Sequence, residues 1–399
     1  MAIELGITRA LRQPEYRSLL SGKRLGLVCH EASVDEETRP SVELLQEAAP
    51  SLGARVSALF SPQHGLFGQD QDNMIESAHG RFRDLPLYSL YSETRRPTAA
   101  MLADVDVLLI DLQDIGTRIY TYLYTASYVM EAAVQAGKPV IVFDRPNPIG
   151  GDSIQGLTLD PAYRSFVGLY PLPTRHGLTI GEAARFMNER HRLNVGKSCA
   201  LRVVPMQGWR RDAYWSDTGL VFVMPSPNIP SPKSCHTFPG FVHFEGTNVS
   251  EGRGTTRPLE QCGAPFVQPE RLIAYLDAEY PQWRDGARVR PTGFLPTFQK
   301  HAARTCRGVF VHPVDRAAFN PVRTGLALLR GIVALYELEF QWKQPPYEYE
   351  LERLPIDVIA GGAWVREWAE GKRPWSEFDE RERTDVAAFE RERREFLLY

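Results

Sequence analysis

The stretch "VDVLLIDL" (residues 105–112) is a continuous apolar run that ends beside a carboxylate. Three similar runs occur in the first half of the chain: "RLGLVC" (24–29), "RVSALF" (55–60) and "PVIVFD" (139–144). Apolar residues that are continuous rather than alternating are typical of strands covered on both faces of a parallel sheet. Helix-compatible stretches lie between these runs, at residues 39–53, 98–105 and 121–137. This alternation predicts an α/β fold with a Rossmann-like, doubly wound parallel sheet.

A last unit of this sheet is predicted before residue 206. Thr179 and Glu182 have the spacing of a capping box, which marks the start of a helix, and "ALRVVPM" (200–206) then has the composition of a strand. A chain of 399 residues is longer than one core usually supports. We therefore predict a first domain at residues 1–212 and a smaller α+β domain at residues 213–399, with a cleft between them.

The second half begins with a segment rich in turns. Five prolines occur in "MPSPNIPSPKSCHTFPGF" (224–241), which predicts a loop or linker rather than a regular element. Helices and strands are predicted from about residue 269 onward. The last of them is a charged helix whose start is marked by Ser376 and Asp379.

Composition narrows the class of protein. A formal charge of −3 and a pI of about 6.3 give no basic excess, which argues against general nucleic-acid binding. No secretion signal or membrane-spanning run is visible, so a cytoplasmic location is expected. Five cysteines without a C-x-x-C pair predict reduced, mostly buried thiols, and no metal site or cofactor is predicted. No Gly-x-Gly-x-x-Gly follows the first strand, so the Rossmann-like layout is no sign of NAD.

Polar side chains follow all four apolar runs. They are His30 and Glu31; Gln63, His64 and the polar run to Glu76; Asp111, Gln113, Asp114 and Arg118; and Asp144, Arg145 and Asn147. Ligands of open α/β sheets bind at the carboxyl ends of the strands. Four polar ends at one edge predict a cleft for a sugar or a phosphate.

The glycine-rich segment "HFEGTNVSEGRGTTRP" (243–258) is a second candidate for the site. Its Glu245, Asn248, Glu251 and Arg253 lie among glycines that let a polar ligand approach the backbone closely. The alternative is a series of structural turns with a surface salt bridge.

Several long strings resemble one known family. They include "LFSPQHGLFG", "DVLLIDLQDIGTRIYTYLYT", "FDRPNPIGG", "PTRHGLTIGE", "PSPNIP" and "EGTNVSEGRGTTRPLEQCGAPF". In this order they are similar to the NamZ-type family (glycoside hydrolase family 171, formerly domain of unknown function 1343), from about Gly6 to Tyr399. The resemblance implies a hydrolase that releases N-acetylmuramic acid (MurNAc) from the non-reducing end of peptidoglycan fragments during cell-wall recycling.

One position departs from the family pattern. Members of the family resemble "PEHG" after the second strand, and this glutamate is their proposed catalytic acid, whereas this chain has Gln63 before His64. An amide cannot donate and recover a proton as a carboxylic acid does. Asp72 and Glu76 follow nearby and supply carboxyl groups.

Three functional hypotheses follow. In the first, hydrolysis is retained with Glu76, Asp70 or Asp72 as the acid and Asp114, Glu245 or Glu251 as its partner. The 2-acetamido oxygen of the substrate could also act as an internal nucleophile, with Gln63 orienting it. In the second, the protein binds sugars or regulates without turnover, and in the third it catalyses a different reaction on a related polar substrate.

The predicted site is therefore large. The predicted catalytic residues are Glu76, Asp114, His64 and Glu251. The predicted substrate-binding residues are Gln63, His30, Asp72, Asn73, Gln113, Arg118, Asn147, His176, Asn228, Glu245, Asn248 and Arg253. Structural alternatives are a turn held by His64 and an ion pair between Arg118 and a neighbouring aspartate. The expected partner is a MurNAc-containing muropeptide or disaccharide, without nucleic acid or membrane, for a monomer or a dimer.

Overall fold

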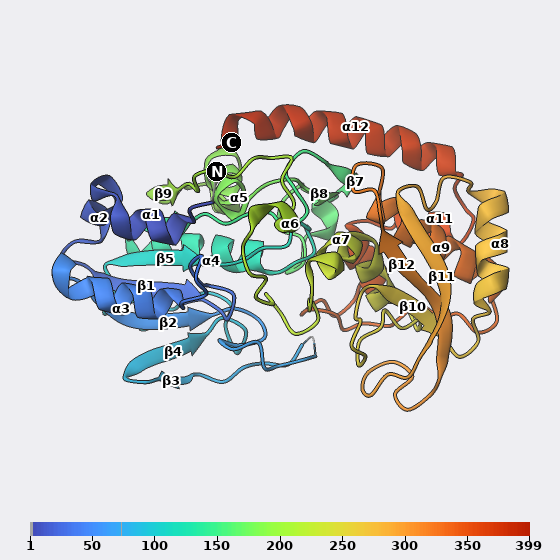
Figure 1. The fold of residues 1–399 in the computed structure, drawn as a ribbon, viewed down its shortest axis with the longest axis horizontal. Helices are drawn as coiled ribbons and strands as arrows, with labels where there is room; N and C mark the ends of the chain where they lie inside the picture. Colours follow the sequence, from blue (N-terminus) through green and yellow to red (C-terminus); the bar gives the residue numbers. More distant parts are fainter. Residues whose placement is uncertain (1–2, 73) are drawn as a thin grey trace.

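The structure, a computed structural model, describes residues 3–72 and 74–399. Its larger sheet has seven strands in the order β3-β4-β2-β1-β5-β6-β9 (Figure 1). Neighbouring strands are parallel except β3, which is antiparallel to β4. This confirms the predicted Rossmann-like α/β sheet. The strands are β1 (Arg24–Cys29), β2 (Arg55–Ser61), β3 (Gly80–Phe82), β4 (Leu85–Ser89), β5 (Val107–Asp111), β6 (Val140–Phe143) and β9 (Leu201–Val204).

The two faces of this sheet are covered by different helices. Leu108 and Ile110 of β5 belong to one core, with α4 (Tyr122–Ala136) and α5 (Ile180–Arg185). Val107 and Leu109 belong to the other core, with α1 (Gly6–Arg12), α2 (Pro14–Leu20) and α3 (Ser41–Leu52). Burying each such aliphatic side chain contributes about 1.5–3 kcal/mol, which is why the strand is apolar on both sides.

The strands end level with one another, and this places the residues that follow them. Cys29 pairs with Asp111, Val28 with Phe60, and Ile110 with Val142. The carboxyl ends of β1, β2, β5 and β6 therefore lie along one edge of the sheet.

The second half contains a smaller antiparallel sheet with the order β10-β12-β11. Its strands are β10 (Gln261–Ala264), β11 (Ala287–Phe294) and β12 (Cys306–Pro313). The helices of this half are α7 (Pro232–Phe241), α8 (Pro269–Glu279), α9 (Pro321–Leu335), α10 (Pro355–Ala360) and α11 (Trp364–Ala369), and α7 and α8 pack against the sheet. Shorter elements are β7 (Gln155–Thr158), β8 (Pro173–Arg175), α6 (Trp215–Thr218), η1 (Pro161–Tyr163), η2 (Phe186–Arg190), η3 (Arg192–Asn194), η4 (Val242–Gly246) and η5 (Arg394–Phe396). The domain boundary at residue 212 stays a prediction.

Three local predictions were wrong. The segment 224–241 contains helix α7, because Pro232 lies at the first helical position, where no backbone N–H is needed, and Ser231 caps the helix. Residues 98–105 form turns instead of a helix. The last helix, α12 (Trp375–Arg393), begins after Pro374 without a side-chain cap, so Ser376 and Asp379 do not mark its start.

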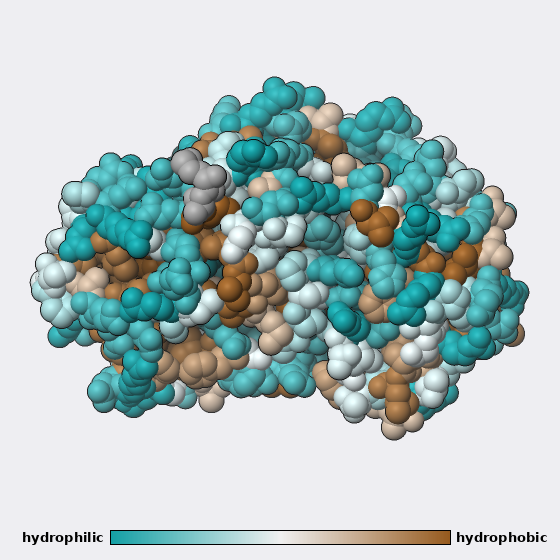
Figure 2. Space-filling model, viewed as in Figure 1, coloured by the Kyte–Doolittle hydropathy of each residue, from teal (hydrophilic) through white to brown (hydrophobic). Residues whose placement is uncertain are grey.

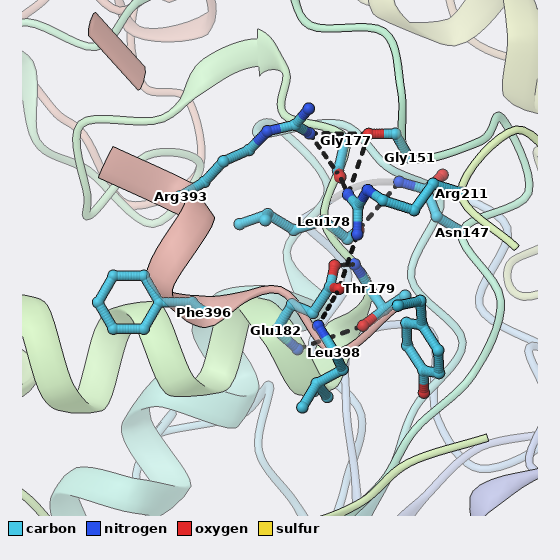
Figure 3. Close-up of polar contacts among 12 residues, drawn as sticks. Asn147, Gly151, Gly177, Leu178, Thr179, Glu182, Arg211, Arg393, Phe396 and Leu398 are labelled. Carbon is cyan, nitrogen blue, oxygen red and sulfur yellow. Dashed lines mark hydrogen bonds and ion pairs between the residues drawn. The ribbon is translucent and has the colours of Figure 1, made fainter. Parts of the chain in front are cut away.

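The capping box at Thr179 and Glu182 is confirmed, and Glu182 also holds the end of the chain. In Figure 1, α12 runs along one side of both halves and brings the C-terminus close to the N-terminus. Figure 3 shows Arg393 donating to the carbonyl of Gly177, at 2.9 Å, while Leu398 N–H donates to Glu182 at 2.8 Å. The last residues of the second half are thereby attached to the first half.

The surface is mainly polar. On the face in Figure 2, apolar residues form small areas separated by hydrophilic ones. Among residues 3–72 and 74–399, no helix combines the length and the apolar character needed to cross a membrane. All five cysteines are buried and free of disulfides.

Candidate active site

A cavity lies beyond the carboxyl end of β2. Both halves of the chain line it. The first half contributes Gln63, His64, Ile119, Tyr120, Thr121 and Val167, and the second contributes Ser226, Asn228, Ile229, Phe238, Val242, Glu245, Arg253, Leu259, Tyr347 and Glu348. Polar and charged side chains from both halves therefore face the same cavity.

Gln63 has a fixed orientation in this cavity. The hydroxyl of Thr121, just before α4, donates to Gln63 Oε1 at 2.8 Å. The amide nitrogen, Nε2, donates to Glu348 Oε1 at 3.2 Å. The NH₂ group of Gln63 is therefore the end that faces Glu348.

Glu348 is a buried carboxyl group that was not among the residues predicted from the sequence. The hydroxyl of Tyr91 donates to its Oε2 at 2.7 Å, and its backbone has a φ of +45°. Burial raises the pKa of Glu348 to about 7, although the hydrogen bonds from Tyr91 and Gln63 oppose this shift. The group is therefore poised to hold or release a proton near neutral pH.

Glu245 is the second carboxyl group of the cavity, and it lies in η4. The element that precedes η4, α7, crosses α9 so closely that a Cβ on Gly240 would lie 1.9 Å from a backbone oxygen of α9. Arg253 forms an ion pair with Glu245, and Tyr347 donates to Glu245 Oε2 at 2.7 Å. Burial alone would raise the pKa of Glu245, but the charge and hydrogen bond of Arg253 outweigh it and hold the pKa below its ordinary value.

Glu251 lies behind this pair and does not line the cavity. Its Oε1 is 3.1 Å from Arg253 Nε, and its Oε2 is 2.6 Å from Lys300 Nζ. Through its contact with Nε, Glu251 orients the guanidinium group of Arg253. The guanidinium Nη1 of Arg253 is buried and has no hydrogen-bond partner within residues 3–72 and 74–399.

His64 and Asn228 also line the cavity. His64 Nδ1 lies 2.7 Å from the carbonyl oxygen of Asp70, to which it donates in the neutral ring. Burial lowers the pKa of His64 to about 4, so the ring is neutral at pH 7 and Nε2 is its acceptor. Asn228 donates to the carbonyl of Gln71 at 2.6 Å.

Six other predicted residues lie inside the first half and do not line the cavity: His30, Gln113, Asp114, Arg118, Asn147 and His176. The backbone N–H of Gln113 donates to His30 Nε2 at 3.0 Å, and the Gln113 amide donates to the carbonyl of Pro146 at 2.9 Å. Asn147 donates to the carbonyl of Leu178 at 2.9 Å. These side chains join the strand ends to one another.

The ion pair with a neighbouring aspartate, given above as the structural alternative for Arg118, is not formed. Arg118 donates to the carbonyls of Ile359 and Val167, at 2.8 and 3.4 Å, and thus links the two halves. Asp114 accepts from Gly116 N–H at 2.6 Å and lies 3.6 Å from His176 Nε2. Arg118, Asp114 and His176 therefore contact other buried groups of the protein and do not face the cavity.

Three further predicted residues, Glu76, Asp72 and Asn248, lie toward the surface. Glu76 is exposed and accepts a hydrogen bond from Tyr349 at 3.3 Å, and Asp72 contacts Gln299. Asn248 lines a different cavity, and Asn73 lies outside the described residues. In the part of the chain that the structure describes, no group of three His, Cys, Asp or Glu side chains is suited to hold a metal ion.

Known proteins resemble this chain along its whole length. The N-terminal part of exo-β-N-acetylmuramidase NamZ matches residues 25–233, and the C-terminal part matches residues 236–399. The peptidoglycan β-N-acetylmuramidase NamZ of Bacillus subtilis (strain 168) is 39% identical over 398 residues, which cover 100% of this chain and 91% of that protein.

Two crystal structures of DUF1343 family proteins from Bacteroides fragilis NCTC 9343 have the same fold. One has a TM-score of 0.86 and 32% identity, and the other has a TM-score of 0.76 and 24% identity. Each comparison covers 100% of this chain and 99% of the other. The chain thus belongs to the NamZ family of exo-β-N-acetylmuramidases.

Proposed function

We propose that this protein is an exo-acting β-N-acetylmuramidase that releases terminal MurNAc from the non-reducing end of peptidoglycan fragments. The observation that carries the proposal is the presence of Glu348 and Glu245 in one cavity, with pKa values moved in opposite directions. Glycoside hydrolysis ordinarily uses one carboxyl group that holds a proton and one that is ionised. The 39% identity to a peptidoglycan muramidase supports the same chemistry.

Arg253 supports MurNAc as the sugar. MurNAc differs from N-acetylglucosamine (GlcNAc) by a lactyl group that ends in a carboxylate. The buried Nη1 of Arg253 has no hydrogen-bond partner within the described chain and offers a charge-assisted hydrogen bond to that carboxylate. Of the other predicted residues, Gln63, His64 and Asn228 line the cavity and are proposed to contact the substrate.

A second function is favoured by Gln63 itself. Where the family's proposed acid is expected, this chain has an amide, so the cavity could bind MurNAc glycosides without cleaving them. This alternative predicts measurable affinity and no product.

The test is incubation of the purified protein with the disaccharide MurNAc-GlcNAc and, separately, with GlcNAc-MurNAc. Release of free MurNAc is followed by mass spectrometry, for the parent, for Glu245→Gln and for the control Glu37→Gln, which changes an exposed residue outside the cavity lining. We expect the parent and the control to cleave only MurNAc-GlcNAc, and Glu245→Gln to be impaired. Binding of MurNAc-GlcNAc without any release would favour the second function, and absence of both would contradict both.

The natural substrate we propose is a MurNAc-terminated disaccharide or muropeptide. A cytoplasmic location, where such fragments would be recycled, stays a prediction from the sequence, as does the choice between monomer and dimer. The domain division near residue 212 is likewise kept as a proposal.

A further inference from the structure

We propose that Glu348 is the proton donor to the leaving group, acting in the place that Gln63 leaves without an acid. The inference rests on the proposed hydrolase function and assigns one catalytic role within it. It names a residue from the second half of the chain, whereas the family's proposed acid follows β2 in the first half.

The carboxyl groups of the cavity narrow the choice of acid. Within residues 3–72 and 74–399, those that line it are Glu245 and Glu348. Glu245 is committed to an ion pair with Arg253, which favours its ionised form. Glu76 is exposed and lies outside the lining, and Asp114 and Glu251 are buried away from it.

The position of Glu348 fits the role. Glu348 Oε1 is 3.2 Å from the Gln63 amide nitrogen. In family members with a glutamate at residue 63, a carboxyl oxygen would replace this amide group. The carboxyl group of Glu348 therefore lies one hydrogen bond away from the position of the family's proposed acid. A glycosidic oxygen that reaches one of these groups is therefore within reach of the other. Tyr91, buried behind Glu348, donates to Oε2 at 2.7 Å and fixes the carboxyl plane.

The environment of Glu348 is also suitable. A proton donor must hold its proton at the working pH and lose it in the transition state, so a pKa near 7 is favourable. Burial supplies this shift, while the neutral donors Tyr91 and Gln63 prevent a larger one. Gln63 thereby acts as a positioning residue, since its amide hydrogen bond orients Glu348 and stabilises the carboxylate that forms after proton transfer.

Glu348 gives its proton to the leaving oxygen and regains a proton from water. As the bond between C1 of MurNAc and the glycosidic oxygen breaks, its electron pair stays on that oxygen, which takes the proton of Glu348 and leaves as an alcohol. A water molecule then adds its oxygen to C1, and the Glu348 carboxylate accepts a proton from that water. The products are MurNAc and the free alcohol, and Glu348 is again protonated.

The test exchanges acid and amide across the same hydrogen bond. Glu348→Gln and the swapped double variant Gln63→Glu/Glu348→Gln are compared with the parent on two substrates. MurNAc-GlcNAc has a poor leaving group that needs protonation, whereas 4-nitrophenyl β-MurNAc has an acidic phenol that leaves with little help. Circular dichroism confirms that each variant is folded.

We expect Glu348→Gln to lose about 10²–10⁴-fold in kcat on MurNAc-GlcNAc. The loss on the nitrophenyl substrate should be at least about tenfold smaller, with KM nearly unchanged, and the swapped variant should regain at least about tenfold in kcat on the disaccharide. If Glu348 had only a structural role, Glu348→Gln would lower kcat equally on both substrates, and the swapped variant would not restore it.

Parental kcat in Glu348→Gln would overturn the inference, and so would an equal loss on both substrates that the swap does not reverse. In both results the parent is active, so they contradict only the role assigned to Glu348 and leave the proposed hydrolase function standing. Failure of the parent to release MurNAc from either substrate contradicts the proposed function instead.

Discussion

Replacement of Glu348 by glutamine is expected to stabilise the folded protein above pH 7, even though it removes the proposed proton donor. Burial raises the pKa of this carboxyl group from 4.5 to about 7. The folded state therefore binds the proton more tightly than the unfolded chain does. Between these two pH values the parent loses stability as pH rises, because ionising Glu348 in the folded protein is unfavourable.

The size of the effect follows from the shift. At about 1.36 kcal/mol per pH unit, the rise from 4.5 to about 7 corresponds to about 3 kcal/mol of unfolding free energy, reached in full above pH 7. Glutamine has nearly the same volume and no charge to desolvate. Tyr91 can still donate to its carbonyl, and Gln63 can turn its amide so that its oxygen accepts from the new NH₂ group.

The neighbouring charges do not change this sign. The ionisable groups around Glu348 include Tyr91, Tyr347, Tyr349, Glu245 and Arg253. Glu245 and Arg253 form their own ion pair and oppose each other at Glu348. The tyrosine hydroxyls remain protonated over this pH range, since burial raises the pKa of Tyr91, Tyr347 and Tyr349.

The assay is urea unfolding followed by tryptophan fluorescence, at pH values from 4.5 to 8.5, for the parent, Glu348→Gln and Glu37→Gln. Comparing variant with parent at each pH removes the contribution of other buried acids. We expect similar stabilities near pH 4.5 and a gain for Glu348→Gln that grows to about 3 kcal/mol at pH 8. The exposed control Glu37→Gln should show no such growth. A difference between Glu348→Gln and the parent that is the same at every pH would refute the reasoning.

Gln63→Glu places two carboxyl groups at hydrogen-bond distance, where they share a proton. The alkaline limb of the pH profile of kcat/KM should therefore move to higher pH, by about one pH unit or more. Rates between pH 4 and 9 test this, and an unmoved limb contradicts it. Arg253→Met leaves Glu245 buried without its ion pair and should lower the unfolding free energy by about 3–5 kcal/mol, with a smaller loss in Arg253→Lys. Urea unfolding of the two variants measures the difference, and equal stabilities would refute it. Arg393→Ala removes a buried donor to the carbonyl of Gly177 and should cost about 2–4 kcal/mol in the same assay, whereas an unchanged unfolding midpoint would show that this attachment contributes little.

Much of the first half could be predicted because its signal is local. The apolar run at residues 24–29 coincides with β1, and the end of α4 lies at Gly137, which has the positive φ of a helix stop. Burial on both faces requires a strand to be apolar throughout, so the pattern appears within a few residues. The helix wrongly predicted at residues 98–105 shows the limit, because Leu102 and Val105 are buried there by turns rather than by a regular face.

The site was only partly predictable for a related reason. Gln63 and His64 follow a strand that the sequence reveals, so their place at the cavity could be anticipated. Glu348 is 285 residues away from Gln63 and lies in an irregular segment without periodicity. Its importance comes from burial and from its neighbours, which only the tertiary structure shows. The local sign was the alternation of tyrosine and glutamate from Tyr347 to Glu350, and this alone predicts neither burial nor a raised pKa.

The backbone around Glu348 gives an independent argument that this carboxyl group has a chemical role. Glu348 and Tyr349 both have positive φ angles, +45° and +68°, which cost about 1–2 kcal/mol for each residue that is not glycine. Burying an ionisable carboxyl group is unfavourable in addition, and an amide would satisfy Tyr91 and Gln63 equally well without it. A residue that only holds the segment in place would therefore be better as glutamine. Strain and a desolvated acid at one residue are explained when the acid itself is used, which is why we expect Glu348→Gln to gain stability and lose turnover together.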